Sequence, residues 1–440
     1  MIDQTRIRDD ESARAESAPA STSTTSVSSG RRPLRPRRRK IALTLLPILL
    51  LAACVAPGPP LTVTFPGKAP RLPGLLPVPD PLPPGPPGTV ISSEVVRPNS
   101  IFPGTQARRF LYRSTDSTGS TIAVSGYVVI PAGTPPPGGW PVMTWAHGTV
   151  GLADACAPSR SPEYWAYGSG GYEQTPGLIG AGVMVVATDY PGLGTDGPHL
   201  YLDGPSAGRS VLDAARAAAA FGGSNRVAIE GFSQGGHAAL FAGMLATTYA
   251  PDLDVVGTLA TAPGSHATFV KTLQPLLGFF GMSGYSPYPG FYAYGLLAAD
   301  RSLNPGDLLE QSGAAKMSAL DDTNCASSPQ LTADDFRADF IQLPNWYAAL
   351  ARNEPGGERI AGPVVIAQGS ADTSVPAIAT SLLCGEYHAN GTDATVWNYD
   401  GQSHTGTMYA SLTDRERWVV ERLDGSTPSA PQSATSVQAC

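Results

Sequence analysis

The stretch RVAIEGFSQGGHAA, residues 226–239, combines the pattern of a buried strand with the start of a helix. Residues 227–230 are largely apolar and β-branched, and residues 235–245 follow with helical periodicity. Between them, a serine on a sharp strand-to-helix turn would present its hydroxyl above the sheet, and its flanking positions need residues without bulk. The pattern predicts that Ser233 is a nucleophile. The alternative is an ordinary glycine-rich turn in a chain with 49 glycines.

The composition indicates an acidic body with an apolar core. A length of 440 residues allows two domains, or one large domain with an insertion. Hydrophobic residues make up 42% of the chain, which is ample for a core, and the formal net charge of −7 argues against a nucleic-acid partner. The sequence has no Cys-x-x-Cys pair and no histidine-rich spacing, so no metal site is expected.

The N-terminal segment, residues 1–53, has the pattern of an export signal. A basic run at residues 31–40 precedes an apolar run at residues 41–53, which is short for a membrane span but fits the apolar region of a signal peptide. The run ends Leu-Ala-Ala-Cys, similar to a bacterial lipobox, which predicts a lipidated Cys54 and peripheral membrane association of a cell-envelope or secreted protein. A weak twin-arginine signal and an uncleaved anchor helix are the other interpretations.

Two segments are predicted to lie outside the folded body. Residues 54–94 are dominated by proline and glycine, which predicts an extended, semi-rigid stalk that holds the body away from a membrane. Residues 425–440 are rich in serine, proline and glutamine, and we expect a disordered tail there.

The cysteines beyond residue 54 fit an exported protein. Their number is even, as expected for disulfides in an oxidising compartment. The residues alone leave three pairings open, with unpaired buried thiols as the alternative. These cysteines are Cys156, Cys325, Cys384 and Cys440.

The body alternates strands and helices, which predicts an α/β fold with a mostly parallel sheet and helices on both faces. Residues 95–262 and 361–424 form the expected core. Residues 263–360 interrupt the alternation with aromatic and glycine-rich sequence that becomes helical around residues 334–351, so a helical cap insertion is expected. Strands are predicted at residues 107–114, 121–130, 141–146, 182–187, 226–232, 255–260, 364–368 and 395–399, and helices at residues 206–221, 235–245 and 406–423.

A serine nucleophile needs an imidazole to accept its proton and a carboxylate to orient that imidazole. Asp372 follows the strand at residues 364–368, and His404 follows the strand at residues 395–399. The order Ser, Asp, His along the chain is that of α/β-hydrolases. Asp400 is the alternative acid, and a surface loop position is the alternative reading of His404.

A tetrahedral intermediate also needs two donors directed at its oxyanion. The backbone N–H of Gln234 is the first expected donor, and the N–H of Gly148 or of Thr149 is the second. The sequence does not distinguish between Gly148 and Thr149. His147 lies in the same loop, and for this residue a direct role in the reaction and a structural role in the loop are equal alternatives. Three further histidines lack a catalytic context: His237, which we expect to pack or cap, His199 and His388.

Several motifs in the same order resemble the secretory lipase family over about residues 95–423. They are AHGT at 146–149, CAPS at 156–159, ATDYPGLG at 187–194, GFSQGGHAALFA at 231–242 and AQGSADTSVP at 367–376. The resemblance implies an α/β-hydrolase with a helical cap that hydrolyses triglycerides or simpler esters without a cofactor. It also implies two disulfides, Cys156 with Cys325 and Cys384 with Cys440.

Together these features predict an exported bacterial ester hydrolase in which Ser233, His404 and Asp372 form a catalytic triad. The aromatic cap would hold the acyl chain of a small-molecule ester or lipid, because burial of an apolar chain is favourable by about 0.8 kcal/mol per CH₂ group. A peptidase or acyltransferase on the same fold would use the same triad, and a non-catalytic surface binding protein is the third reading.

Overall fold

The computed structural model describes most of the chain beyond residue 56. The described residues are 57–70, 72–96, 104–160, 175–266, 288–319, 325, 331, 333–337 and 343–440, and all belong to one unit, Ala52–Cys440. The predicted export signal and Cys54 lie outside them. Within the described ranges, every helix is too short or too polar to cross a bilayer.

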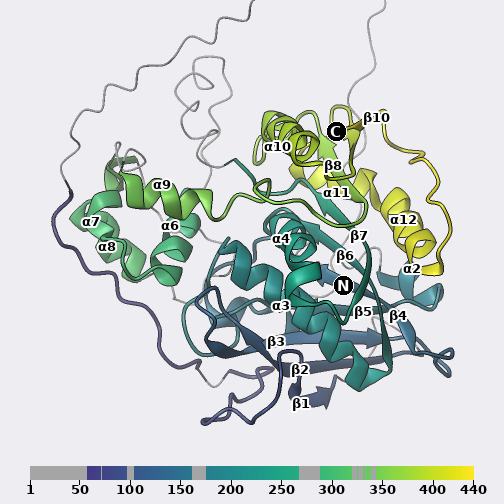
Figure 1. Ribbon diagram of the computed structural model, residues 1–440. Helices are drawn as coiled ribbons and strands as arrows, with labels where there is room; N and C mark the ends of the chain where they lie inside the picture. Colours follow the sequence, from purple (N-terminus) through teal and green to yellow (C-terminus); the bar gives the residue numbers. More distant parts are fainter. Residues whose placement is uncertain are drawn as a thin grey trace, which may run out of the picture. The chain divides into compact units, whose positions relative to one another are not determined.

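A ten-stranded mixed sheet runs through the body in the order β1-β2-β3-β5-β4-β6-β7-β8-β9-β10 (Figure 1). The strands from β5 through β4, β6, β7 and β8 to β9 are parallel, and antiparallel pairs extend both edges. The strands are β1 Val90–Val95, β2 Gln106–Thr115, β3 Thr121–Ile130, β4 Trp140–Ala146, β5 Met184–Thr188, β6 Gly223–Phe232, β7 Asp254–Thr261, β8 Val364–Gly369, β9 Ala394–Tyr399 and β10 Ser436–Ala439.

Helices cover both faces of this sheet, as predicted. Successive side chains of a strand point to opposite faces, so Val142 of β4 packs with side chains of α3 and α4, whereas the adjacent Met143 packs with those of α2 and α12. The central strands are mostly apolar, as expected for strands with both faces buried. The helices of the body are α2 Thr175–Gly180, α3 Gly204–Ala217, α4 Gln234–Tyr249, α10 Ala377–Asn390, α11 His404–Ala410 and α12 Leu412–Asp424, with 3₁₀ turns at Asp154–Cys156, Pro158–Arg160 and Ala218–Phe221.

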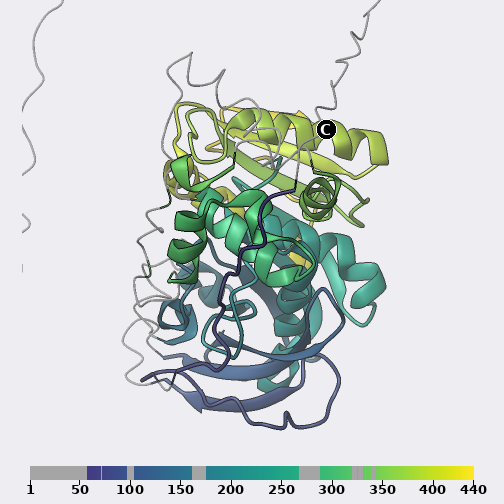
Figure 2. The same cartoon turned by 90° about the vertical axis from the view of Figure 1, so that its left-hand side faces the viewer.

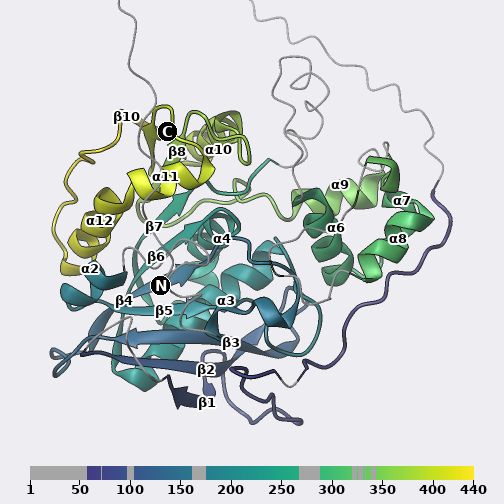
Figure 3. The same cartoon turned by 180° about the vertical axis from the view of Figure 1, so that it is seen from behind.

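Between β7 and β8 the chain leaves the sheet and forms a separate group of helices, seen from opposite sides in Figures 1 and 3. This group, the cap, contains α6 Tyr288–Ala299, α7 Pro305–Leu308, α8 Gln311–Ser318 and α9 Pro344–Ala351, with a 3₁₀ turn at Ala333–Asp335. Its core surrounds the fully buried Trp346, whose Nε1 donates to Asp307 at 3.3 Å. The outer limits of the cap stay a prediction, because residues 267–287 lie outside the described part.

Residues 57–70, here called the strap, correct the prediction of a free stalk. The strap is extended, but it crosses the cap and continues toward the body, as the purple segment in Figure 2 shows. Val63 is buried in the apolar core of the cap, and the ring of Phe65 lies 4.9 Å from that of Tyr294. The N–H of Gly58 donates to Asp307 at 2.8 Å. The stalk reading is wrong because apolar side chains between the prolines find partners on the cap.

The far end of the strap joins the body. The N–H of Ala69 donates to Asp196 at 2.9 Å, and the N–H of Gly197 donates to the carbonyl of Gly67 at 2.9 Å. Farther along the predicted stalk, β1 begins at Val90 and pairs with β2. The sheet therefore includes residues that the sequence analysis assigned to the segment before the body.

The C-terminal segment corrects a second expectation, because it is ordered against the body. β10 pairs antiparallel with β9, and the N–H of Cys440 donates to the carbonyl of Ala394 at 2.8 Å. A disulfide joins Cys440 to Cys384 of α10. Asp414 accepts hydrogen bonds from the backbone of Gln432 and Ser433. Pairing with the open edge of β9 satisfies backbone groups that a disordered tail would leave to solvent.

Candidate active site

The turn between β6 and α4 holds Ser233 in a strained backbone conformation. Its φ of 58° and ψ of −115° lie in a region that non-glycine residues rarely adopt, and such strain is common at functional sites. The flanking glycines permit the turn. A Cβ on Gly231 would lie 2.1 Å from the carbonyl oxygen of Gly235, and a Cβ on Gly235 would lie 1.8 Å from that of Ala146. Both positions therefore require glycine, as the motif predicts.

The structure brings together the three side chains that the sequence analysis selected from distant segments. The hydroxyl of Ser233 lies 2.8 Å from Nε2 of His404, and Nδ1 of His404 lies 2.7 Å from Oδ2 of Asp372. The imidazole donates through Nδ1 to the carboxylate and accepts at Nε2. The side chain of Asp372 is fully buried, while that of His404 remains 13% exposed. Ser233 as a whole is half-buried.

The loop after β8 fixes the orientation of Asp372. Its Oδ1 accepts hydrogen bonds from the backbone N–H groups of Ser374 at 2.9 Å and Val375 at 2.8 Å. The buried Gln368, which the sequence analysis did not select, donates to the carbonyl of Val375 at 3.2 Å and holds the far side of this loop. The alternative acid, Asp400, is exposed and accepts a hydrogen bond from Ser370 at 2.7 Å. Asp372, rather than Asp400, contacts the imidazole.

The predicted oxyanion donors lie on two segments that meet behind Ser233. Gln234 is the first residue of α4, where a backbone N–H has no partner within the helix. The loop after β4 backs onto this turn, since a Cβ on Gly235 would also lie 2.6 Å from the carbonyl oxygen of His147. In the same loop Gly148 packs against the ring of Phe232, and the hydroxyl of Thr149 lies 2.7 Å from that of Tyr201. The choice between Gly148 and Thr149 stays open.

The other histidines near the site are buried and have structural partners. Burial lowers the pKa of His147 and of His237 to about 4 and that of His199 to about 3, so all three rings are neutral at neutral pH. His147 contacts the carbonyl oxygen of Gly148 at 2.6 Å, and His237 donates to that of Asn353 at 2.8 Å. His388 is exposed on α10. The expectation that His237 is a packed residue agrees with this placement.

The cap approaches the triad at the start of α6. Burial, with the negative charge of Asp372 as the second cause, raises the pKa of Tyr288 above its usual value. The phenol therefore lies close enough to the triad acid to experience its charge. Tyr288 also packs at the edge of the apolar core of the cap. In the sequence this tyrosine is only one residue of the aromatic and glycine-rich segment at 263–360.

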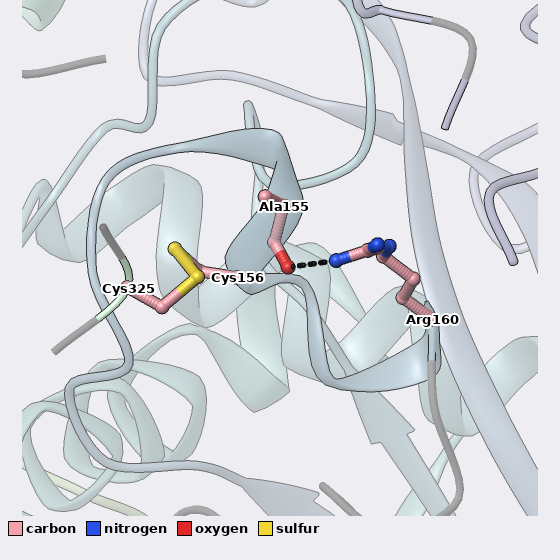
Figure 4. The surroundings of a disulfide bond; sticks show 4 residues. All are labelled: Ala155, Cys156, Arg160 and Cys325. Atoms are coloured by element: carbon pink, nitrogen blue, oxygen red, sulfur yellow. Dashed lines mark hydrogen bonds between the residues drawn. A yellow bond between two sulfur atoms is a disulfide. The ribbon is translucent and has the colours of Figure 1, made fainter. Parts of the chain in front are cut away.

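A disulfide ties the cap segment at Cys325 to the segment that follows the loop after β4 (Figure 4). Cys156 is fully buried and bonds to Cys325, while Nη1 of Arg160 donates to the carbonyl of Ala155 at 2.8 Å beside it. A Cβ on Gly151 would lie 2.5 Å from the carbonyl oxygen of Cys325. The bond thus holds the two segments in close contact.

The order of the sheet and the strained serine turn after a parallel strand define an α/β-hydrolase fold. Within the ranges that the structure describes, no cluster of three or more His, Cys, Asp or Glu side chains is arranged to bind a metal ion. Residues 175–275 match the sequence model of the secretory lipase family. This match supports a relationship to that family and a hydrolase function on acyl esters.

Two relatives and a solved structure are similar to this chain. The chain is 25% identical over 359 residues to a Mycobacterium tuberculosis protein named "probable inactive lipase", covering 77% of this chain and 79% of that protein. It is 30% identical over 229 residues to lipase A of Moesziomyces aphidis, covering 48% of this chain and 44% of the relative. The closed state of Candida antarctica lipase A matches with a TM-score of 0.66 and 21% identity over 79% of this chain and 84% of the other. That structural match shows the fold alone.

Proposed function

We propose that the protein is an exported serine hydrolase that cleaves carboxylic esters of acyl chains through an acyl-enzyme intermediate. The observation that supports the mechanism is the hydrogen-bond chain from Ser233 to His404 at 2.8 Å and from His404 to Asp372 at 2.7 Å. A neutral serine is a weak nucleophile, and such a chain provides the base that activates it.

In this proposal the reaction has two similar halves. Oγ of Ser233 attacks the ester carbonyl carbon while Nε2 of His404 takes the hydroxyl proton, and the π electrons of the carbonyl move onto its oxygen. The backbone N–H of Gln234, together with that of Gly148 or Thr149, binds the oxyanion. The intermediate collapses as the protonated imidazole gives its proton to the leaving alcohol. Water then repeats the sequence on the acyl-enzyme and releases the carboxylic acid.

The cap is the proposed site for the apolar part of the substrate. Tyr288 at the start of α6 has a pKa raised by burial and, to a lesser degree, by the charge of Asp372. The cap core is rich in leucine and aromatic side chains. Apolar burial would supply binding energy in proportion to the length of the acyl chain.

Export and membrane anchoring form the second part of the proposal. The two disulfides fit an oxidising compartment, and the description of the family as secretory agrees with export. The lipobox-like sequence before Cys54 motivates a lipid anchor at that cysteine. Mass spectrometry of the mature N-terminus would find a diacylglyceryl Cys54; an unmodified terminus at another position would refute the anchor.

Labelling with a fluorophosphonate tests the nucleophile directly. The oxidised full-length protein is expected to be labelled, S233A is expected to lose the label, and S381A, which changes an exposed serine on α10, is expected to keep it. Persistent labelling of S233A would assign the reactive group elsewhere. A native chain that takes up no label and hydrolyses no ester would favour a non-catalytic binding protein, the reading raised by the relative named "probable inactive lipase".

A substrate panel separates the reaction classes that one triad can serve. Esters of increasing acyl length are compared with peptide amides of the same acyl group, and product analysis in the presence of alcohols detects acyl transfer. Hydrolysis of the esters, without cleavage of the amides and without transfer as the main outcome, is the expected result. Preferential amide cleavage would make the protein a peptidase, and preferential transfer would make it an acyltransferase.

A further inference from the structure

The short segment between β5 and α3 contacts the side chains of residues on both sides of the proposed oxyanion hole. It contains His199 and Tyr201, which lie outside every motif used to select the site. His199 contacts Gln234, and Tyr201 contacts Thr149. Both residues of the segment are buried, with exposed fractions of 1% and 3%.

The contact between His199 and Gln234 has a defined direction. Nδ1 of His199 lies 3.0 Å from the carbonyl oxygen of Pro191, which can only accept, so the ring proton is on Nδ1. Burial lowers the pKa of His199 to about 3, which leaves Nε2 unprotonated. Nε2 therefore accepts a hydrogen bond from the side-chain amide of Gln234 at 3.0 Å. This bond restrains the residue whose backbone N–H is the first proposed donor.

Tyr201 restrains the opposite side. Its hydroxyl lies 2.7 Å from that of Thr149, in the loop that supplies the second donor. The backbone N–H of Tyr201 donates to the carbonyl of His199 at 2.9 Å, so the two residues belong to one tight turn. Helix α6 of the cap packs against this turn. The ring of Phe291 lies 5.6 Å from that of Tyr201, and a Cβ on Gly295 would lie 2.0 Å from the carbonyl oxygen of Tyr201.

We propose that His199 and Tyr201 are positioning residues that set the geometry of the oxyanion hole. This inference rests on the proposed function. Neither side chain touches the substrate; each holds a residue whose backbone would bind the oxyanion. A displacement of about 1 Å in a catalytic group can lower the rate by about 10²-fold, so the loss of either hydrogen bond is expected to slow the chemical step without weakening substrate binding.

Two variants each remove one of these hydrogen bonds and leave every backbone donor in place. Y201F removes the hydroxyl that contacts Thr149, and Q234L removes the side-chain amide that contacts His199. The matched control is Y249F, at the opposite end of α4 from Ser233, where the lost hydroxyl contacts Asp213 and Thr115 at 2.8 Å. The measurements are kcat and KM on a soluble short-chain ester, the inhibition constant of a trifluoromethyl ketone, and thermal unfolding.

The ketone distinguishes a positioning role from a purely structural one. Attack by Oγ of Ser233 on the ketone carbon forms an O–C bond, transfers the hydroxyl proton to His404 and leaves an oxyanion that resembles the transition state. Loss of one oxyanion donor lowers kcat by roughly 10²–10³, so displacement of a donor is expected to cost about tenfold to 100-fold. The affinity for the ketone should fall by the same factor in Y201F and Q234L, with KM nearly unchanged, while Y249F behaves like the native protein.

Each remaining outcome counts against a specific claim. Native kcat and native ketone affinity in both folded variants would overturn the inference while leaving the proposed function intact. A fall in kcat with unchanged ketone affinity would also overturn it, because the defect would then lie outside the oxyanion hole. If Y201F does not fold, Q234L decides alone. A native chain that neither hydrolyses esters nor binds the ketone overturns the proposed function, and this inference with it.

Discussion

The carboxylate of Asp372 lies between its own loop and the imidazole of His404. One oxygen accepts hydrogen bonds from the backbone N–H groups of Ser374 and Val375, and the other lies 2.7 Å from Nδ1 of His404. The loop thus fixes the carboxylate before it meets the imidazole. In the proposed mechanism the carboxylate keeps the ring proton on Nδ1, so that Nε2 accepts the proton of Ser233.

This arrangement predicts a large effect of D372N and none of D400N. In D372N the backbone N–H groups of Ser374 and Val375 still donate to the side-chain oxygen, so the side-chain NH₂ group faces His404. Because that group can only donate, it favours the tautomer with the ring proton on Nε2. We expect kcat to fall by roughly 10⁴. Asp400 is exposed and contacts Ser370, so D400N should retain the native kcat. Steady-state kinetics on one ester decides the matter, and a loss in D400N that exceeds the loss in D372N would reassign the acid.

The space around two helical glycines, Gly235 and Gly385, predicts opposite effects of changing each of them to alanine. A Cβ at residue 235 would lie 1.8 Å from the carbonyl oxygen of Ala146, which is main chain and cannot rotate away. G235A should therefore destabilise the fold and abolish hydrolysis. A Cβ added to Gly385, inside α10, would meet no heavy atom within 4 Å, so G385A should stabilise the protein by up to about 1 kcal/mol. Urea unfolding measures both, and a G235A variant with native stability would contradict the turn geometry.

The sheet and the candidate triad follow from local patterns in the sequence. Parallel strands align their carboxyl ends at one edge, so the residues directly after β6, β8 and β9 are expected to meet there. The glycine-flanked turn selected Ser233, and the position after a strand selected Asp372 and His404. The structure brings these three side chains together. The glycines at 231 and 235 were informative because no other residue fits their close approaches.

The strap, β10 and the turn at His199 and Tyr201 did not follow from local patterns. A proline-rich composition indicates that a segment forms no helix and no central strand, but it does not indicate whether its side chains pack. Val63 and Phe65 pack on the cap, which lies more than two hundred residues away in the sequence. The partners of His199 and Tyr201 are likewise distant in sequence. Such contacts depend on the complete fold.

The strap predicts a stability effect that a free stalk would not produce. The ring of Phe65 lies 4.9 Å from that of Tyr294, and the guanidinium carbon of Arg301 lies 4.1 Å from the centre of the Phe65 ring. F65A loses this apolar and cation–π contact, and because the ring is half-buried we expect the free energy of unfolding to fall by about 1–3 kcal/mol. Thr62 is exposed on the same strap, so T62A is the control in urea unfolding. Equal free energies of unfolding in F65A and T62A would support the prediction of a free stalk.

The buried histidines contribute a loss of stability in acid. Burial lowers the pKa of His199 to about 3 and that of His147 and His237 to about 4, from a usual value of 6.5. Between pH 6.5 and 4 the unfolded chain therefore binds protons that the folded chain does not, and the free energy of unfolding falls as the pH falls. Asp189 acts in the opposite sense, because burial raises its pKa to about 6 and the folded chain takes up its proton first. His266, Asp203, Asp213 and Glu416 also have raised pKa values and act in the same sense as Asp189, so the histidine contribution is measured with a variant that removes one ring.

Urea unfolding at pH 7 and pH 5 measures this dependence and assigns part of it to His237. Each excess proton bound by the unfolded chain contributes about 1.4 kcal/mol per pH unit. H237Q removes one such group, while its amide can still donate to the carbonyl of Asn353, which His237 contacts at 2.8 Å. The loss of stability between pH 7 and pH 5 should therefore be smaller in H237Q than in the native protein. H388Q changes an exposed histidine and should keep the native dependence. An H237Q variant with the native dependence would mean that His237 is protonated equally in the folded and unfolded chains, contrary to its burial against Asn353.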